Sequence, residues 1–540
     1  MTTALQQEHP QESVVRSATL VSIAVLFSRA TGLVREMVMA RLFGAGFVYD
    51  AFLLGFRIPN LTRDLFAEGA LSSAFVPAFT ATLTKKGKDE AALLSNLVAT
   101  AIICIVGVFC ILGIVFAPAL VELLAPGFRQ VPGKFELAVS MTRIMFPFLL
   151  LVALAAQAMG MLNACNRFGV PAMSSTFFNI GSVGLGLVAG FVLGPYLHIE
   201  KITGMAIGVV LGGALQLLYQ LPSLSRLGFR FRPAIDWSHA ELRRIVHLMG
   251  PAIIGSAAVQ INAMVNTNFA SRIPGNGPVS WLGYAFRFMQ FPLGLFGVAI
   301  ASATLPSISR SAAAGNMDEF RRTLSRSLGL VFLLTLPSSI GLVLLGKSMI
   351  GAIYEGGRFS VEATNQTALA LSCYALGLTG YSALKVVVPA FYALGSARTP
   401  MLVSLVSILL NYLASAKMSA RFGFSGLALS TSTVALFGAV ALFLILRHRI
   451  QGVYGRDLAG SILRICAAAA VMAAAVYSSN LLITGHMGVG RLAHLINLMV
   501  SMPLGVAVFY WGCKLLRVKE LDMARRGLPQ RFYFKKITPN

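Results

Sequence analysis

Charged side chains recur through residues 28–77, in a stretch whose other residues are mostly apolar. They are Arg29, Arg35, Glu36, Arg41, Asp50, Arg57, Arg63, Asp64 and Glu68. An ionisable side chain at the centre of a membrane-spanning helix costs about 2.5–3.5 kcal/mol on insertion scales. If this stretch spans a membrane, its charges must therefore face protein or a water-filled cavity. Arginine in such a place suits an anion, because a guanidinium binds two oxygens of a phosphate or pyrophosphate at once.

The spacing of the first charges predicts one face of a helix. Ser28, Gly32 and Arg35 are four and three residues apart, and Arg29, Gly32 and Glu36 are three and four apart. Both sets lie along one helical stripe. Gly32 on that stripe allows a neighbouring helix or a ligand to approach closely.

A structural explanation of these charges competes with anion binding. Arg29 or Arg35 can pair with Glu36, Asp50 or Asp64 and hold helices together. The four acids of this stretch can in principle neutralise Arg29, Arg35, Arg57 and Arg63. The N-terminal half of the chain leaves both explanations open.

The C-terminal half favours an anion. Arg287 lies in the apolar run YAFRFMQFPLGLFG, and residues 278–312 contain no carboxylate. Lys385 lies in SALKVVVP, again without a nearby acid. Lys385 has alternatives, because its long side chain can reach the membrane surface or bind carbonyls left free by Pro389. Together the two halves predict a net positive cavity that suits an anionic, amphiphilic substrate.

Composition identifies the elements that carry these residues as membrane spans. The chain has 540 residues, of which 56% are hydrophobic and 12% charged, whereas soluble proteins are about 25% charged. Apolar runs of 18 or more residues recur throughout, as expected of an all-α polytopic membrane protein. Fourteen spans are predicted, at about 16–41, 48–82, 91–118, 136–163, 172–195, 202–222, 242–272, 278–312, 320–345, 363–394, 399–419, 424–446, 459–483 and 488–516. The second, eighth and tenth are too long for one straight crossing and contain Pro59, Pro292 and Pro389, so we expect bends or re-entrant irregularity there.

The distribution of basic residues predicts the orientation. The formal net charge of +24 would suggest nucleic acid in a soluble protein. Here most Lys and Arg residues lie in loops that follow even-numbered spans and in the C-terminal tail. The positive-inside rule then places both termini in the cytoplasm, and no nucleic-acid partner is expected.

An internal repeat at an offset near 230 predicts two similar lobes. Phe56-Arg57 aligns with Phe286-Arg287, and Gly127 of LLAPGF aligns with Gly357 of IYEGGRF. Arg167 and Pro171 likewise correspond to Arg398 and Pro400. Because an even number of spans separates each pair, the repeats run parallel, around a central cavity. The predicted parts are a tail at 1–15, an N-lobe of six spans at 16–222, a linker at 223–241, a C-lobe of six spans at 242–446, two extra spans at 447–516 and a basic tail at 517–540.

No enzymatic or metal-binding pattern is present in the sequence. It has no G-x-S-x-G, no Walker A motif and no metal-ligand spacing among its histidines. The six cysteines are scattered through apolar segments without a C-x-x-C pair. We therefore predict no catalytic residue, no metal and no cofactor. Without a nucleotide site, transport must draw on an ion gradient or on the membrane voltage, which is worth about 2.3 kcal/mol per charge per 100 mV.

Several runs resemble one known family along essentially the whole chain. They are FSRATGLVREMVMARLFGAG, DAF at Asp50, PNLTRDLFAEGALSSAFVP, LAPGF, NRFGVP, RFMQFPLGLFGVA from Arg287 and GLALSTS at 426–432. Together they resemble the MurJ/MviN family of lipid II flippases, part of the multidrug/oligosaccharidyl-lipid/polysaccharide exporter superfamily. The resemblance implies two six-helix lobes around a V-shaped cavity, alternating access, and export of an undecaprenyl-pyrophosphate-linked peptidoglycan precursor from the inner to the outer leaflet of the bacterial cytoplasmic membrane.

The resemblance also implies roles for individual residues. Arg29, Arg35, Arg63 and Arg287 match the family's essential cavity arginines, and Asp50 its essential acid. Glu68 matches the glutamate of the AEGA motif, and the two extra spans look like the pair that forms a groove for the polyprenyl tail. Arg57 and Lys385 are added from the charge pattern as further substrate contacts.

The sequence departs from some relatives beside Arg287, where Phe286 and Gln290 replace acidic residues. A role for carboxylates flanking Arg287 is therefore in doubt, and a sodium site described for some members has no matching acids here. Lipid II and membrane lipids are the expected partners, together with cell-wall synthesis proteins, and we expect a monomer to function. The competing functions are a cation-coupled drug or other polyprenyl-oligosaccharide exporter, and a scaffold without transport. Cationic drugs would need cavity carboxylates, and a scaffold would need balanced charges in both halves.

Overall fold

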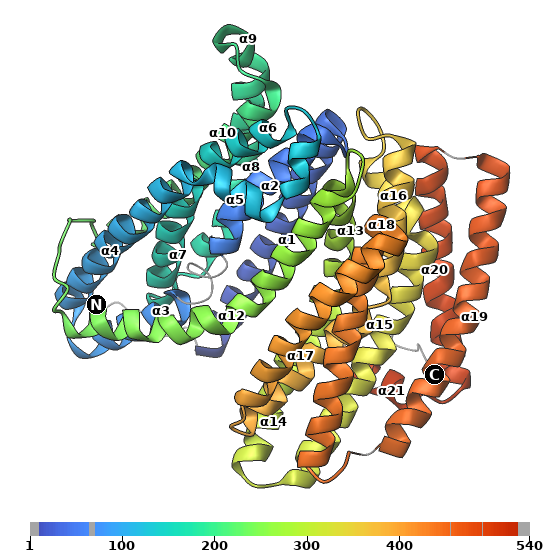
Figure 1. Ribbon diagram of the computed structural model, residues 1–540. Helices are drawn as coiled ribbons and strands as arrows, with labels where there is room; N and C mark the ends of the chain where they lie inside the picture. The colour runs from blue at the N-terminus through green and yellow to red at the C-terminus, as the bar shows by residue number, and fades with distance from the viewer. Residues whose placement is uncertain (1–9, 64–70, 454, 489, 527–540) are drawn as a thin grey trace, which may run out of the picture. The chain divides into compact units, whose positions relative to one another are not determined.

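The computed structural model describes residues 10–63, 71–453, 455–488 and 490–526, and it is helical throughout these ranges apart from short connections (Figure 1). The only extended pairing in these ranges is an isolated bridge between Gly356 and Phe359. The chain divides into two compact units, residues 1–277 and 278–540. The all-α fold predicted from the sequence is confirmed.

The first unit contains helices α1 to α12, with one 3₁₀ segment and one π segment. Their bounds are α1 Pro10–Phe43, α2 Phe47–Arg63, α3 Ser72–Lys85, α4 Lys88–Val115, α5 Ala117–Leu124, the 3₁₀ helix η2 Pro126–Gln130, α6 Lys134–Met145, α7 Phe148–Ala164, α8 Gly169–Leu187, the π helix η3 Val188–Val192, α9 Gly194–Leu197, α10 Lys201–Leu218, α11 Leu221–Arg226 and α12 Ala240–Arg272.

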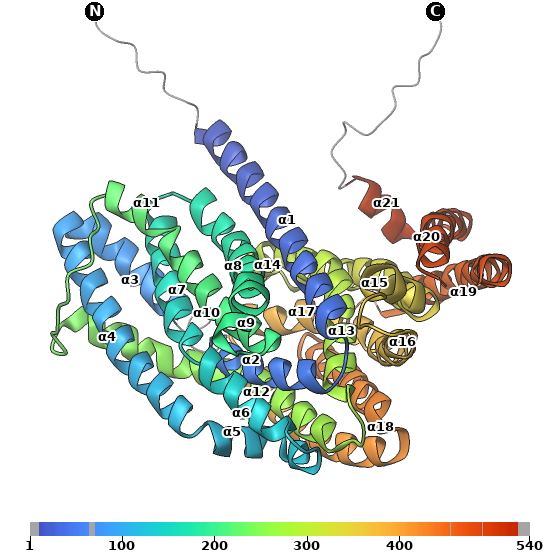
Figure 2. The ribbon, with the colours of Figure 1, turned by 90° about the horizontal axis from the view of Figure 1, so that it is seen from above.

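The second unit contains helices α13 to α21. Their bounds are α13 Pro278–Pro292, the π helix η4 Leu293–Val298, α14 Ala299–Ala313, α15 Met317–Tyr354, α16 Val361–Ala375, α17 Leu378–Ala393, α18 Arg398–Arg449, α19 Gly455–Met487, α20 Arg491–Leu515 and α21 Lys519–Arg526. In Figures 1 and 2 the helices α19 and α20 lie beside α15 at the edge of this unit.

Every one of the fourteen predicted spans is helical where the structure describes it. Nine of the described helices are long and apolar enough to cross a membrane, or ten if the bent pair α16–α17 counts as one span. The long helix α18 accounts for two predicted spans, because Gly423 breaks its helical geometry at φ 60°. Helices α1, α2 and α12 are not among that number, α2 because it has only 17 residues, so the total of fourteen crossings stays a prediction.

Two of the three long predicted spans are interrupted in the structure, the eighth at its proline and the tenth away from it. Pro59 lies inside α2, and residues 64–70 of the second span lie outside the described residues. Pro292 ends α13 and the π helix η4 follows at once, as expected where proline removes a backbone donor. The tenth predicted span is instead bent by 42° between Ala375 and Leu378. The tenth span is therefore bent as predicted, but the bend does not lie at Pro389, which is inside the continuous helix α17.

Each unit has its own apolar core, and the cores repeat along the chain. In the first unit α3, α4 and α7 meet through Phe75, Leu94 and Leu162. In the second unit the corresponding helices α14, α15 and α17 form a core around Phe320 and Phe391.

The starts of matching helices confirm the repeat. The pairs α4 and α15, α7 and α17, and α8 and α18 begin at Lys88 and Met317, Phe148 and Leu378, and Gly169 and Arg398, which are 229 or 230 residues apart.

Helix α12 packs with the first unit, although the sequence predicts that the C-lobe begins at residue 242. Its Leu242 and Ile245 belong to the core built by α3, α4 and α7, and its C-terminal end contacts α5 and η2. The compact units therefore divide after Gly277. The functional lobes at 16–222 and 242–446, the linker and the tails stay a prediction.

Candidate functional site

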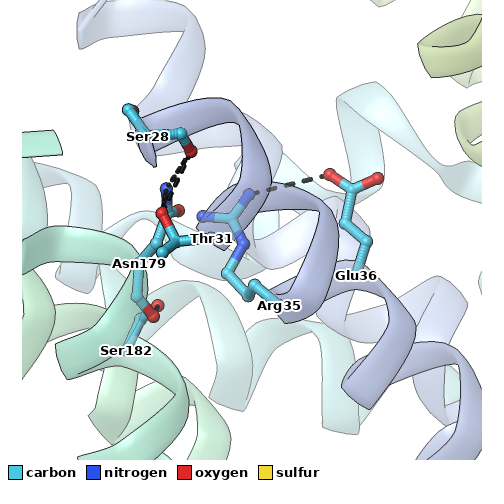
Figure 3. Close-up of polar contacts among 6 residues, drawn as sticks. All are labelled: Ser28, Thr31, Arg35, Glu36, Asn179 and Ser182. Atoms are coloured by element: carbon cyan, nitrogen blue, oxygen red, sulfur yellow. Dashed lines mark hydrogen bonds and ion pairs between the residues drawn. The ribbon is translucent and has the colours of Figure 1, made fainter. Parts of the chain in front are cut away.

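The stripe predicted on α1 faces α8 (Figure 3). Asn179 of α8 donates through Nδ2 to the Ser28 carbonyl at 3.1 Å and to Thr31 Oγ1 at 3.3 Å. A Cβ on Gly32 would lie 3.4 Å from the same Nδ2. Gly32 thus allows a neighbouring helix to come close, one of the two alternatives that its position in the stripe predicts.

Arg35 lies on the same side of α1, and its guanidinium is shared between two neighbours. It stands 5.4 Å from the centre of the Phe178 ring of α8. Its Nη2 lies 3.8 Å from Glu36 Oε1, an ion pair without hydrogen-bond geometry (Figure 3). Glu36 is 7% exposed. Arg29 lies on the exposed surface of α1, so the described part of this stripe offers one exposed and one partly paired arginine.

Asp50 is fully buried in the first turn of α2. It accepts a hydrogen bond from Lys134 Nζ at 2.8 Å and another from the backbone N–H of Gly277 at 3.0 Å. The Lys134 side chain is only 3% exposed, and its ammonium also lies 4.5 Å from the centre of the Phe128 ring. A buried ion pair with such additional donors holds three segments together: the start of α2, the start of α6 and the end of the segment that follows α12.

Sequence reasoning missed Lys134 as a functional residue. In the linear sequence it is only one of the few basic residues in a loop after an odd-numbered predicted span. The one available signal was its place seven residues after Gly127 of the LAPGF motif. Nothing in the linear pattern brings it to Asp50, 84 residues away.

Arg57 joins α2 to α12. Its guanidinium donates to Thr267 Oγ1, and the Thr267 side chain is buried. A second link lies nearby, where Asn268 Nδ2 donates to the Leu123 carbonyl at 2.7 Å. Arg57 was predicted as a substrate contact, and the structure places its guanidinium at a helix–helix junction.

The glycine of the LAPGF motif is explained by the same junction. A Cβ on Gly127 would lie 2.1 Å from the Ser271 carbonyl oxygen of α12. The Gly127 N–H donates to Ser271 Oγ at 3.4 Å. Any side chain at this position would therefore push the C-terminal end of α12 away from η2.

The side chains of two predicted site residues, Arg63 and Glu68, are not described by the structure. Arg63 is the last residue of α2, which fixes its place along that helix. Glu68 and Asp64 lie outside the described residues.

Arg287 lies on the exposed side of α13, between two aromatic anchors. Phe286 packs edge-on against Tyr374 of α16, with ring centres 5.4 Å apart, and Phe288 packs against Tyr354 of α15 at 5.6 Å. These contacts fix the rotation of α13 and hence the side on which Arg287 projects. They also give Phe286 a packing role of its own.

Lys385 is exposed in the middle of α17, and its neighbours Val386 and Val387 are buried in the core. This exposure fits either substrate contact or a side chain that reaches for the membrane surface. The two alternatives predicted from the sequence therefore both remain.

Among the described charged residues of α1, α2, α13 and α17, basic side chains outnumber acidic ones. Glu36 and Asp50 each have a cation within 4 Å, whereas Arg29, Arg287 and Lys385 are exposed. No group of three or more His, Cys, Asp or Glu side chains able to hold a metal occurs within the described ranges. Exposed basic side chains attract anions.

Comparison with known proteins identifies the family. A family model described as lipid II flippase MurJ matches residues 39–498. The lipid II flippase MurJ of Burkholderia cenocepacia is 34% identical over 446 residues, which cover 82% of this chain and 85% of that protein. The chain belongs to the MurJ family of lipid II flippases. The probable lipid II flippase MurJ of Vibrio cholerae agrees, with 32% identity over 523 residues, 94% of this chain and 97% of that protein.

Solved structures support the MurJ fold. A lipid II flippase MurJ in an inward closed conformation matches with a TM-score of 0.75 and 25% identity, over 92% of this chain and 100% of that one. An inward-facing multidrug resistance MATE family transporter of the MOP superfamily matches with a TM-score of 0.62 and 14% identity, over 80% of this chain and 94% of that one. The second match shows a shared fold alone. As a MurJ family member, the chain is a multi-pass membrane transporter, and the family predicted from its motifs is confirmed.

Proposed function

We propose that this protein moves lipid II, an undecaprenyl-pyrophosphate-linked saccharide-peptide, from the inner to the outer leaflet of the bacterial cytoplasmic membrane for peptidoglycan synthesis. The observation that carries this proposal is the excess of exposed basic groups on helices of membrane-spanning character. Glu36 and Asp50 have Arg35 and Lys134 within 4 Å, and the side chains of Arg29 and Arg287 are exposed. An anionic head on a long lipid is the substrate class that such helices suit.

In this proposal Arg29, Arg35, Arg63 and Arg287 bind the pyrophosphate. Guanidinium groups suit it because each can donate two hydrogen bonds to its oxygens. Binding energy from several arginines also offsets the cost of taking the charged head out of water. Lys385 contributes a point charge, and Glu68 belongs to the same substrate-binding set.

Asp50 and Arg57 act differently from the other predicted contacts. Their described partners are Lys134, Gly277 and Thr267 of the first unit. We propose that they hold α2, α6 and α12 in register, so that the arginines of α1 and α2 keep their places. Loss of either residue then reduces transport without removing a direct substrate contact.

Transport proceeds by alternating access without a catalytic step. The membrane voltage, negative inside, assists the outward movement of an anion by about 2.3 kcal/mol per charge per 100 mV. Both termini and the basic tail at 517–540 lie in the cytoplasm, and the protein acts as a monomer beside the cell-wall synthesis proteins that use its product. The α19–α20 pair, within the predicted part 447–516, provides the groove for the polyprenyl tail.

The test replaces the arginines one at a time. Arg29→Ala, Arg35→Ala, Arg63→Ala and Arg287→Ala should each abolish support of cell-wall synthesis in a strain depleted of its own flippase, while the protein still inserts in the membrane. The matched control is Arg244→Ala, because Arg244 is an exposed arginine near the start of α12. Normal growth with three of the four variants would contradict the arginine model.

A second measurement identifies the substrate. After depletion of the protein, the leaflet that holds the lipid-linked precursor is determined with a reagent that reaches only the outer face. Lipid II should accumulate in the inner leaflet. Unchanged outward exposure of the precursor would refute the flippase assignment and return attention to a drug or another polyprenyl-linked saccharide.

A further inference from the structure

A seam of buried polar side chains runs between α15 and the C-terminal helices α19 and α20. Its centre is Asn497 of α20, which is fully buried. The Asn497 amide donates to Ser348 Oγ of α15 at 2.7 Å and to Asn480 Oδ1 of α19 at 2.6 Å. Its own Oδ1 accepts from Ser501 Oγ at 2.7 Å. One side chain thus bonds to all three helices.

The seam extends on both sides of Asn497. Ser501 also bonds to Ser479 of α19, with the two hydroxyl oxygens 2.8 Å apart. Towards the start of α20, Arg491 donates to the Ala352 carbonyl of α15 at 3.2 Å. The two connections therefore tie α20 to α19 and to the C-terminal end of α15.

Close packing accompanies these bonds near the end of α15. A Cβ on Gly351 would lie 2.4 Å from Cδ2 of His494, which is itself 2% exposed. His494 Nε2 faces Glu355 Oε2 at 3.8 Å. Only glycine leaves room for the imidazole here, so α20 lies directly against α15 at this point.

Such a seam matters because the hydrophobic effect does not hold helices together inside a membrane. Lipid tails are as apolar as leucine, and helix association there depends on close packing and hydrogen bonds. The outer faces of the two helices are apolar, with Leu463, Leu482, Met499 and Val506 all more than half exposed. Among the described helices, α15 is the one against which both α19 and α20 pack extensively.

The same helix α15 also supports Arg287. Tyr354, three residues after Gly351, packs against Tyr284 and Phe288 of α13, with ring centres 4.7 and 5.6 Å away. These two residues flank Arg287 in the helix, three positions before it and one after it. A continuous series of contacts therefore leads from Asn497 through α15 to the helix that carries Arg287.

We propose that Asn497 is a positioning residue that fastens the α19–α20 pair to α15 and so sets the distance between this pair and Arg287. This role rests on the function proposed above. During transport, the two ends of one substrate bind at the two ends of a frame formed by α13, α15 and the α19–α20 pair. The arginine holds the charged head and the pair holds the tail. The frame then selects lipids in which head and tail are separated by the matching length.

The first test measures the frame itself. Spin labels are attached to cysteines placed at the exposed positions Phe291 on α13 and Met499 on α20, in full-length protein whose six native cysteines have been replaced. The parent should give one narrow distance distribution. Asn497→Leu should broaden it, because two of its hydrogen bonds join α20 to α15 and α19, and losing two bonds of average strength for membrane helices shifts the balance between attached and detached forms of α20 by about eightfold.

Two further variants guard against general damage. Ser348→Ala removes only the bond between α15 and α20 and should broaden the distribution less. Ser430→Ala is the matched control, because Ser430 is a fully buried serine of α18 whose hydroxyl bonds to Ser415, away from the seam. It should leave the distances unchanged. An unchanged distribution in both Asn497→Leu and Ser348→Ala would overturn the positioning role.

The second test measures selection by length. Flipping is followed in reconstituted vesicles with lipid II and with an analogue whose tail is too short to reach the pair. Asn497→Leu should slow flipping of the full-length lipid much more than that of the short analogue. Equal slowing of both would refute the role in substrate selection. The distance measurement needs no substrate, so it stands apart from any failure of the flippase assignment.

Discussion

The buried pair of Asp50 and Lys134 gives the sharpest prediction. Both side chains are almost completely enclosed, and their charged atoms are 2.8 Å apart. Removing one partner of a buried ion pair leaves an uncompensated charge, which costs about 3–5 kcal/mol. Asp50→Asn and Lys134→Met should therefore each destabilise the protein by about that amount. The double variant has no buried charge left, so its loss should be smaller than the sum of the two by about 2–3 kcal/mol.

Reversing the pair should not restore it. The N–H of Gly277 donates to the same Asp50 oxygen at 3.0 Å, and the first turn of α2 favours an anion. In the variant Asp50→Lys with Lys134→Asp, the ammonium at position 50 meets that N–H donor instead of an acceptor. The reversed variant should thus be less stable than the neutral pair Asp50→Asn with Lys134→Met.

The assay is the midpoint of unfolding in detergent, followed by intrinsic fluorescence for the four variants and the parent under one set of conditions. The apparent coupling is the difference between the double variant and the sum of the single ones. Additive effects of the two single changes would refute the coupling of this pair. Full recovery in the reversed variant would refute the role of the Gly277 donor.

Two contacts of α12 give the remaining predictions. Gly127→Ala should lower the unfolding midpoint and reduce transport, because its Cβ would lie 2.1 Å from the Ser271 carbonyl oxygen and overpacking costs about 1–3 kcal/mol. Gly107→Ala, with nothing within 4 Å of its Cβ, is the control and should leave both unchanged. Thr267→Val removes the acceptor of Arg57 and should lower the free energy of unfolding by about 1.5–3 kcal/mol, the usual range for a hydrogen bond to a charged group. Arg57→Met should give a similar loss in the same measurement. An unaltered midpoint in both variants would show that the bond contributes nothing.

Pairing of the acids decides what the arginines can do. In the sequence, the charged stretch at 28–77 contains four carboxylates, enough to neutralise all but one of its five arginines. In the structure, Asp50 is matched with Lys134, a cation from outside that stretch. This exchange removes one acid from the balance against the α1 and α2 arginines and strengthens the case for an anionic substrate.

From sequence alone the chain was predicted to be an all-α polytopic membrane protein, with the positions of its helices and its family. Inside a membrane a long apolar run forms a helix, because every backbone N–H and C=O group must find its hydrogen-bond partner within the segment. The offset near 230 predicted the repeat, and the matching helices of the two halves begin 229 or 230 residues apart. The stripe of Ser28, Gly32 and Arg35 followed from the helical period alone, and it does face a neighbouring helix.

Which polar side chains contact one another across helices became known only from the tertiary structure. Lys134 reaches Asp50 from 84 residues away, Arg57 meets Thr267 from 210 residues away, and Asn497 bonds to Ser348 across 149 residues. The apolar pattern that places a residue on a helix does not state which helix lies opposite, because lipid and protein satisfy an apolar face equally well. A buried polar side chain needs a hydrogen-bond partner, and which partner it finds depends on how whole helices pack.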